Sequence, residues 1–103
     1  MAKLITVYWR DIPAQVIVKR GRESAKVQLS HRFQVAIDRA AMRAGKGSSD
    51  KYLEDWRRES RDCGADLQQA AEAEAERLEA AYSDELLGRM IRAGGVVPPS
   101  PPG

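Results

Sequence analysis

The stretch LITVYWRDIPAQVIVK, residues 4–19, decides the fold of the N-terminal half. Its first part is rich in β-branched and aromatic side chains, which favour a strand. Alternate residues of a strand point to opposite faces, so Ile5, Val7 and Trp9 share one face. Pro13 interrupts the run because proline cannot donate a ladder hydrogen bond. The stretch therefore predicts two strands joined by a short turn.

The residues that follow predict a third strand and then a change of period. Strand character resumes over residues 14–19, and residues 25–29 form a short strand in which Lys26 and Gln28 point outward. From Ser30 onward the apolar residues recur at helical spacing, as far as about residue 44. The chain thus begins with a small antiparallel sheet that needs helices to be stable.

Further helices are expected in the second half. A second helix is predicted over residues 50–62, after a glycine-rich connection, and a third over residues 65–82. Ser83 restarts a short helix, and residues 96–103 contain four prolines. The expected fold class is α+β, with a small antiparallel sheet of about three strands packed against two helices and a C-terminal helical extension.

Three regions follow from this organisation. Residues 1–64 are the expected α+β core domain, and residues 65–93 the acidic helical extension. Residues 94–103 are the expected Gly/Pro-rich disordered tail. A chain of 103 residues is too short for two full-sized domains, so the extension is expected to add to a single modest core.

Charge is unevenly distributed along the chain, although the net charge is only +2. Residues 1–35 hold seven Lys or Arg and two Asp or Glu, whereas residues 66–103 hold three and seven. The basic part could meet an anionic partner, and the acidic part could shield it. The alternative is a solvated surface without a partner.

Most catalytic and metal chemistries lack the residues they need. His31 and Cys63 are single copies with no paired ligand spacing, so neither a metal nor a cofactor is expected. No nucleophile motif is present, and the chain is expected not to be an enzyme. The loop Gly45–Ser49 could hold an anion, although a tight helix–helix connection is the favoured interpretation.

Composition also bears on the location of the protein. A single cysteine excludes an internal disulfide framework, and no apolar run reaches the length that spans a membrane. We therefore expect a cytoplasmic protein without a membrane partner.

Seven residues are candidates for binding a protein partner. Trp and Arg are the residues that most often anchor interfaces. The apolar stripe of the 65–82 helix is too thin to build a core and suits docking on a partner or on its own sheet. For each tryptophan the alternative is packing in the core. The candidates are Trp9, Arg10, Asp11, Trp56, Arg57, Leu67 and Leu78.

One string is distinctive enough to suggest a family. YWRDIPAQV (residues 8–16), together with Phe33, AIDRAAM (36–42) and YLEDWR (52–57), resembles the bacterial virulence-factor domain family, which includes the C-terminal module of conserved virulence factor C. The resemblance covers about residues 4–58 and leaves the C-terminal part as a lineage-specific extension. It implies small stand-alone chains and gene neighbours in folate- and corrinoid-dependent one-carbon metabolism.

Two functions are consistent with these observations. The first is a non-catalytic accessory subunit that binds a larger enzyme subunit, which the resemblance favours. The second is a dimeric ribbon-helix-helix DNA-binding protein, in which Lys26 and Gln28 would face bases. That arrangement is lost on one edge if residues 14–19 pair with the third strand within the same chain.

Overall fold

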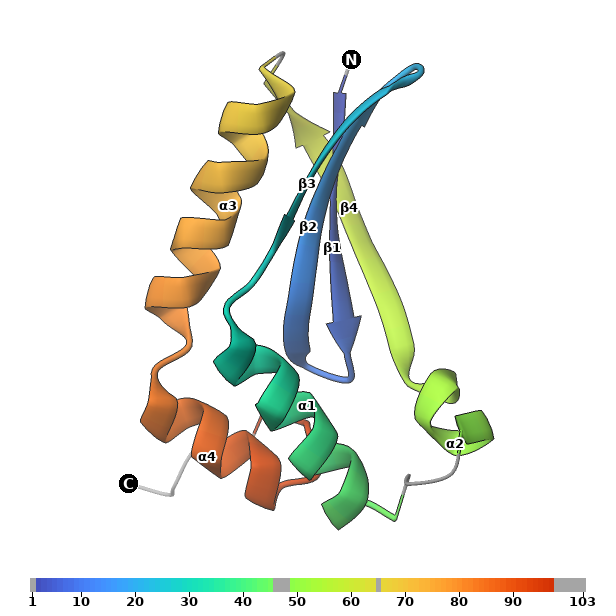
Figure 1. Ribbon diagram of the computed structural model, residues 1–103, viewed down its shortest axis with the longest axis vertical. Coiled ribbons are helices and arrows are strands. Elements are labelled where there is room, and N and C mark those ends of the chain that lie inside the picture. The colour runs from blue at the N-terminus through green and yellow to red at the C-terminus, as the bar shows by residue number, and fades with distance from the viewer. Residues whose placement is uncertain (1, 46–48, 65, 98–103) are drawn as a thin grey trace.

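The computed structural model describes residues 2–45, 49–64 and 66–97. It is an α+β fold of four strands and four helices (Figure 1). In chain order the elements are β1 (Ala2–Trp9), β2 (Ile12–Arg20), β3 (Glu23–Gln28), α1 (His31–Arg43), α2 (Ser49–Glu54), β4 (Trp56–Cys63), α3 (Leu67–Ala81) and α4 (Asp84–Arg92).

The sheet is antiparallel throughout, with the strand order β3-β2-β1-β4. The three predicted strands are confirmed, and β2 pairs with β3 within the chain. The predicted helix over residues 50–62 is wrong beyond Glu54, because residues 56–63 form β4. β4 has almost no apolar alternation, and its pairing along the whole length of β1 holds it in place.

Helix α3 covers one face of the sheet, where it packs on β2 and β3 (Figure 1). Leu78 and Ala71 of α3 are almost fully buried in the same apolar core as Val16 of β2. The segment expected to extend from a finished domain is therefore a layer of the core. Helix propensity predicted the helix correctly. Its thin apolar stripe is enough to pack on the sheet because the buried alanines, Ala71 and Ala75, let α3 lie close to the strands.

Helices α1 and α4 pack side by side at the end of the sheet where β1 turns into β2 (Figure 1). Phe33 and Ile37 of α1 and Met90 of α4 are buried there, as the helical spacing of α1 predicts. Ser30 occupies the N-cap position of α1, but its hydroxyl binds Glu79 of α3, at 2.9 Å, in place of a backbone amide.

The first part of the expected tail belongs to the fold. Gly94 and Gly95 are buried, and the backbone N–H of Asp11 donates to the carbonyl of Gly95 at 2.9 Å. The N–H of Val97 donates to the Asp11 carboxylate at 2.8 Å. The proline-rich residues 98–103, also expected to be disordered, lie outside the described residues.

No helix within the described residues is long and apolar enough to cross a membrane.

Candidate functional site

Trp9 is an internal anchor and has no surface to offer a partner. Its side chain is fully buried, and the indole Nε1 donates to the carbonyl of Tyr52 at 2.8 Å. The Tyr52 ring stacks on the indole, with centroids 5.9 Å apart, and meets Trp56 edge-on at 5.7 Å. The candidate role of Trp9 in partner binding is therefore wrong for this fold, and core packing is the correct alternative.

Arg10 and Asp11 form the turn between β1 and β2, and their side chains bind other parts of the chain. The Arg10 guanidinium lies 5.2 Å from the Trp9 ring centroid and donates to the Asp55 carboxylate at 3.2 Å and to the Gly94 carbonyl at 2.9 Å. The Asp11 carboxylate accepts from Arg57 at 3.1 Å. These contacts make the turn a junction of β4 and the C-terminal segment.

Arg57 is more exposed than its partners in this junction, but it too is fixed within the chain. Its Nε donates to the Arg10 carbonyl at 2.7 Å, and the guanidinium lies over the Tyr8 ring at 4.5 Å. Burial works to lower the pKa of Arg57, but the Glu59 and Asp11 carboxylates raise it above its ordinary value. Arg57 is thus a firmly charged structural cation.

Leu67 and Leu78 face the sheet of their own chain. Leu78 is buried, and Leu67 is half-buried against the same core. The expectation that this stripe binds a separate partner is wrong for Leu78, because the sheet already covers it.

Trp56 differs from the other six candidates. It lines a cavity on the side away from α3, and its aromatic side chain is half-buried, so part of the ring is accessible.

The sheet face opposite α3 is an open surface that sequence reasoning missed. Three rows of directly paired residues cross it from β4 through β1 and β2 to β3, and only Val7 among them is buried. The rows are Asp62–Lys3–Lys19–Ser24, Ser60–Ile5–Ile17–Lys26 and Arg58–Val7–Gln15–Gln28. We call these twelve residues the open face.

The open face has an apolar centre and a basic border. Ile5 and Ile17 form its middle and are half-buried. Lys19, Lys26 and Arg58 stand around them, and none forms an ion pair with any residue that the structure describes. The acidic residue of the face, Asp62, is paired with Lys3 at 3.0 Å. The face therefore carries a net positive charge around two isoleucines.

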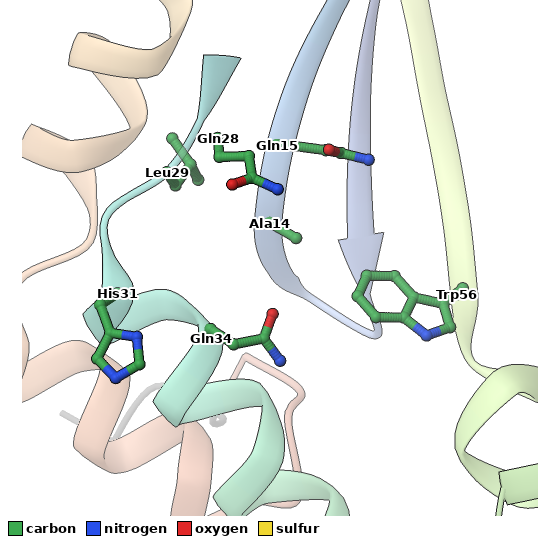
Figure 2. Close-up of a pocket in the computed structure, with 7 residues that line it drawn as sticks. All are labelled: Ala14, Gln15, Gln28, Leu29, His31, Gln34 and Trp56. Carbon is green, nitrogen blue, oxygen red and sulfur yellow. The ribbon is translucent and has the colours of Figure 1, made fainter. Parts of the chain in front are cut away.

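A cavity of about 440 Å³ opens at the lower end of this face, between the sheet and α1 (Figure 2). Carboxamide groups from three elements line it together with an indole. Figure 2 shows the Gln34 amide pointing from α1 toward the sheet, and the Gln28 amide pointing into the space from β3. The lining residues are Ala14, Gln15, Gln28, Leu29, His31, Gln34 and Trp56.

The covered face of the sheet holds a buried carboxylate that is fully paired. Glu74 of α3 is 5% exposed and accepts from Arg77 at 2.6 and 2.8 Å and from Arg61 of β4 at 2.9 Å. Its hydrogen bonds with Arg77 hold the pKa of Glu74 below its ordinary value, although burial opposes them. This cluster fixes α3 to β4 and leaves no carboxyl poised for proton transfer.

Metal ligands do not gather anywhere in the described part of the chain. Residues 2–45, 49–64 and 66–97 contain no group of three or more His, Cys, Asp or Glu side chains that could hold an ion. His31 begins α1 and is exposed, and Cys63 ends β4 as a free thiol. The centre of the Gly45–Ser49 loop, the candidate anion site, lies outside the described residues.

Comparisons with known proteins show one relationship. The search of curated proteins and the search of solved structures each found no match. The family model described as "Virulence factor" matches residues 7–91. The match includes β4, α3 and all of α4 but its last residue, so the helices expected to be a lineage-specific extension lie inside the family's own region. Because the model covers most of the chain, this protein belongs to the virulence factor family.

Proposed function

We propose that this protein is a non-catalytic interaction module, an accessory subunit that binds an acidic segment of a larger protein through the open face. The observation that carries the proposal is the pair of half-buried isoleucines, Ile5 and Ile17, on an uncovered sheet face with three cations around them. A desolvated apolar centre with a polar rim is the usual anatomy of a protein interface.

The chemistry of the centre favours a protein over a nucleic acid. Sheets that bind single strands present aromatic side chains on which bases stack. The central strands of the open face present Ile5 and Ile17 instead, which bury well against aliphatic side chains. Lys19, Lys26 and Arg58 then select a partner with carboxylates around its apolar contact residues.

The ribbon-helix-helix alternative receives less support from the fold, because the ribbon is lost on the edge of β3 that pairs with β2. In that architecture a lone strand pairs with its copy from a second subunit, and two helices follow it. Here β3 is paired with β2 of its own chain, and the expected second helix is a single short helix followed by β4. Lys26 and Gln28 do point outward as predicted, but from a continuous four-stranded sheet.

The resemblance to the virulence-factor family suggests the setting of the partner. Its implied neighbours are enzymes of folate- and corrinoid-dependent one-carbon metabolism, so a larger enzyme subunit of such an assembly is the partner we propose. The role of the protein would be to bind and position that subunit, with no reacting group of its own.

Site-directed photo-crosslinking in the cells that make the protein tests this function. A photoreactive residue placed at Ile17 should yield one dominant protein adduct, whereas the same residue at Ala73, exposed on α3, should not. The captured protein, once purified, should bind the wild-type chain in calorimetry. Lys19→Glu and Lys26→Glu should each weaken binding about tenfold, since like charges meet across the interface.

Arg39→Glu is the matched control, because Arg39 is an exposed cation on α1, outside the open face. Equal weakening by Arg39→Glu would show a nonspecific charge effect and contradict the proposal. A nuclease-sensitive nucleic-acid adduct at Ile17, with no protein adduct, would replace it with nucleic-acid binding.

A further inference from the structure

We propose that the cavity between β2, β3 and α1 is a binding site for one uncharged, planar heterocycle of the nucleobase type. This inference goes beyond the proposed function and does not depend on it, because the partner would cover the isoleucine row and the heterocycle would enter the cavity below that row. Gln15 and Gln28 belong to both surfaces, since they lie in the last row of the open face.

The lining of the cavity carries no Lys, Arg, Asp or Glu, in a chain whose residues are 31% charged. Three of the chain's five glutamines meet there, one each from β2, β3 and α1. Gln34 adds an acceptor, and the carboxamides of Gln15 and Gln28 each present a donor and an acceptor side by side. This pair of groups matches the adjacent acceptor and donor on the edge of a base, which glutamine recognises in a bidentate manner.

Trp56 supplies the flat apolar surface that a heterocycle also needs. Its indole is half-exposed toward the cavity, and its position is fixed from behind by Tyr52, which stacks on the buried Trp9. An aromatic ring held in this way can contact the face of a planar ligand with little loss of side-chain entropy. Stacking on aromatic side chains is the usual way in which proteins hold bases.

The amide of Gln34 is also held in place before any ligand arrives. Its Nε2 donates to Asp38 one turn along α1, at 3.0 Å. A hydrogen bond to Gln34 works against the burial that raises the pKa of Tyr52. A hydrogen bond that lowers the pKa of a phenol is donated to its oxygen, so both Nε2 hydrogens of Gln34 are engaged within the chain and its Oε1 is the atom left to accept from a ligand. The volume of about 440 Å³ falls within the range of ligand sites.

A base could reach the cavity as a free nucleoside or as part of a single strand, and the experiment separates these sources. Adenosine, guanosine, cytidine and uridine, followed by single-stranded tetranucleotides, are titrated against the full chain. Tryptophan fluorescence reports on Trp56, because the fully buried Trp9 is shielded from the ligand. Side-chain amide NMR signals of Gln15, Gln28 and Gln34 report on the carboxamides directly.

We expect at least one nucleoside to saturate the Trp56 signal and shift the three amide signals. Gln28→Leu should weaken that binding about tenfold without affecting folding, since Gln28 is exposed on an edge strand. Gln68→Leu, at an exposed position of α3, is the matched control and should bind like the wild type. Tighter binding of a tetranucleotide identifies a base in a strand as the ligand, and equal binding identifies a free nucleoside.

Two results would overturn the inference. One is the absence of saturation by every nucleoside and tetranucleotide up to millimolar concentration. The other is unchanged affinity in Gln28→Leu. Neither result touches the crosslinking test at Ile17, so the failure of one proposal is distinguishable from the failure of the other.

Discussion

Gly95 lies directly against the indole of Trp9, and its conformation explains why no other residue fits. A Cβ built on Gly95 would lie 2.6 Å from Cζ3 of Trp9, and the backbone φ is +98°. Both constraints arise because the C-terminal segment passes over the tryptophan on its way to Asp11. The sequence predicted a helix-ending glycine here, but not the close approach, which involves residues more than eighty positions apart.

We predict that Gly95→Ala destabilises the fold by about 3 kcal/mol or more, since it combines a clash with backbone strain. Urea unfolding measures the effect. Gly21→Ala is the control, because its φ of +59° is similarly strained but no atom lies within 4 Å of the added carbon. That variant should lose only about 1–2 kcal/mol. Equal losses would show that Trp9 does not crowd Gly95.

Glu74 gives a pH-dependent prediction at the same scale. Because its pKa is held below the ordinary 4.5, chiefly by Arg77, it stabilises the fold above that value. The contribution is lost as the pH falls through the folded-state pKa. Glu74→Gln should therefore cost about 2 kcal/mol at pH 7, and the difference from wild type should vanish in acid.

Urea unfolding at pH 7 and again near pH 3 tests this expectation. Glu72→Gln, exposed on the same helix, should change stability by less than about 0.5 kcal/mol at neutral pH. A deficit in Glu74→Gln that stays constant down to pH 3 would contradict the role assigned to the carboxylate.

Among the elements, β4 and α3 show what a local pattern can and cannot predict. β1, β2 and α1 were predictable because alternation and helical spacing are local signals. In β4, the side chains of Trp56–Cys63 are mostly charged and exposed, and the strand exists because β1 offers an edge to pair with. The open face could not be predicted without β4, since Arg58 and Ser60 complete two of its rows.

The same comparison applies to the candidate binding residues. Trp9 and Leu78 were chosen as surface residues for their type, but their environment depends on long-range packing. The glutamines of the cavity are unremarkable along the sequence, because a polar residue on an alternating strand is the usual solvent-facing choice. Only the fold brings Gln15, Gln28 and Gln34 to one place.

We predict that truncating Leu78 in α3 destabilises the core and does not merely release a partner. Leu78→Ala should cost about 2–5 kcal/mol, as expected for a buried leucine. Glu76→Ala, exposed on the same helix, should stay within about 0.5 kcal/mol of the wild type. Thermal unfolding compares the two, and a Leu78→Ala chain of unchanged stability would show that α3 does not cover the sheet.

At the scale of the whole molecule, the turn between β1 and β2 holds the fold together. Arg10 binds Asp55, the residue directly before β4. Asp11 binds Arg57, near the start of β4, and Val97, after the end of α4. The apolar core likewise runs without interruption from β1 to Met90 of α4. Elements expected to form a core and a separate extension are therefore stabilised together.

Among the described residues, the C-terminal segment contacts Asp11 as far along the chain as Val97. A chain ending after Val97 should keep the thermal midpoint of the full protein, because it retains every described contact with Asp11. A chain ending after Ala93 loses the Gly94 and Gly95 hydrogen bonds and should melt several degrees lower. Differential scanning calorimetry measures both, and equal midpoints for the two truncations would contradict the anchoring of this segment.

The position of β1 in the sheet also has a consequence for how the protein is made. Of the four described strands, β1 is synthesised before the others but lies between β2 and β4, so one of its edges stays unpaired until residue 63 has been synthesised. The apolar face that α3 covers stays exposed longer still. Strand pairings between distant residues form slowly, and exposed strand edges promote association between chains. An N-terminal fragment that ends before β4 should therefore aggregate where the full chain does not.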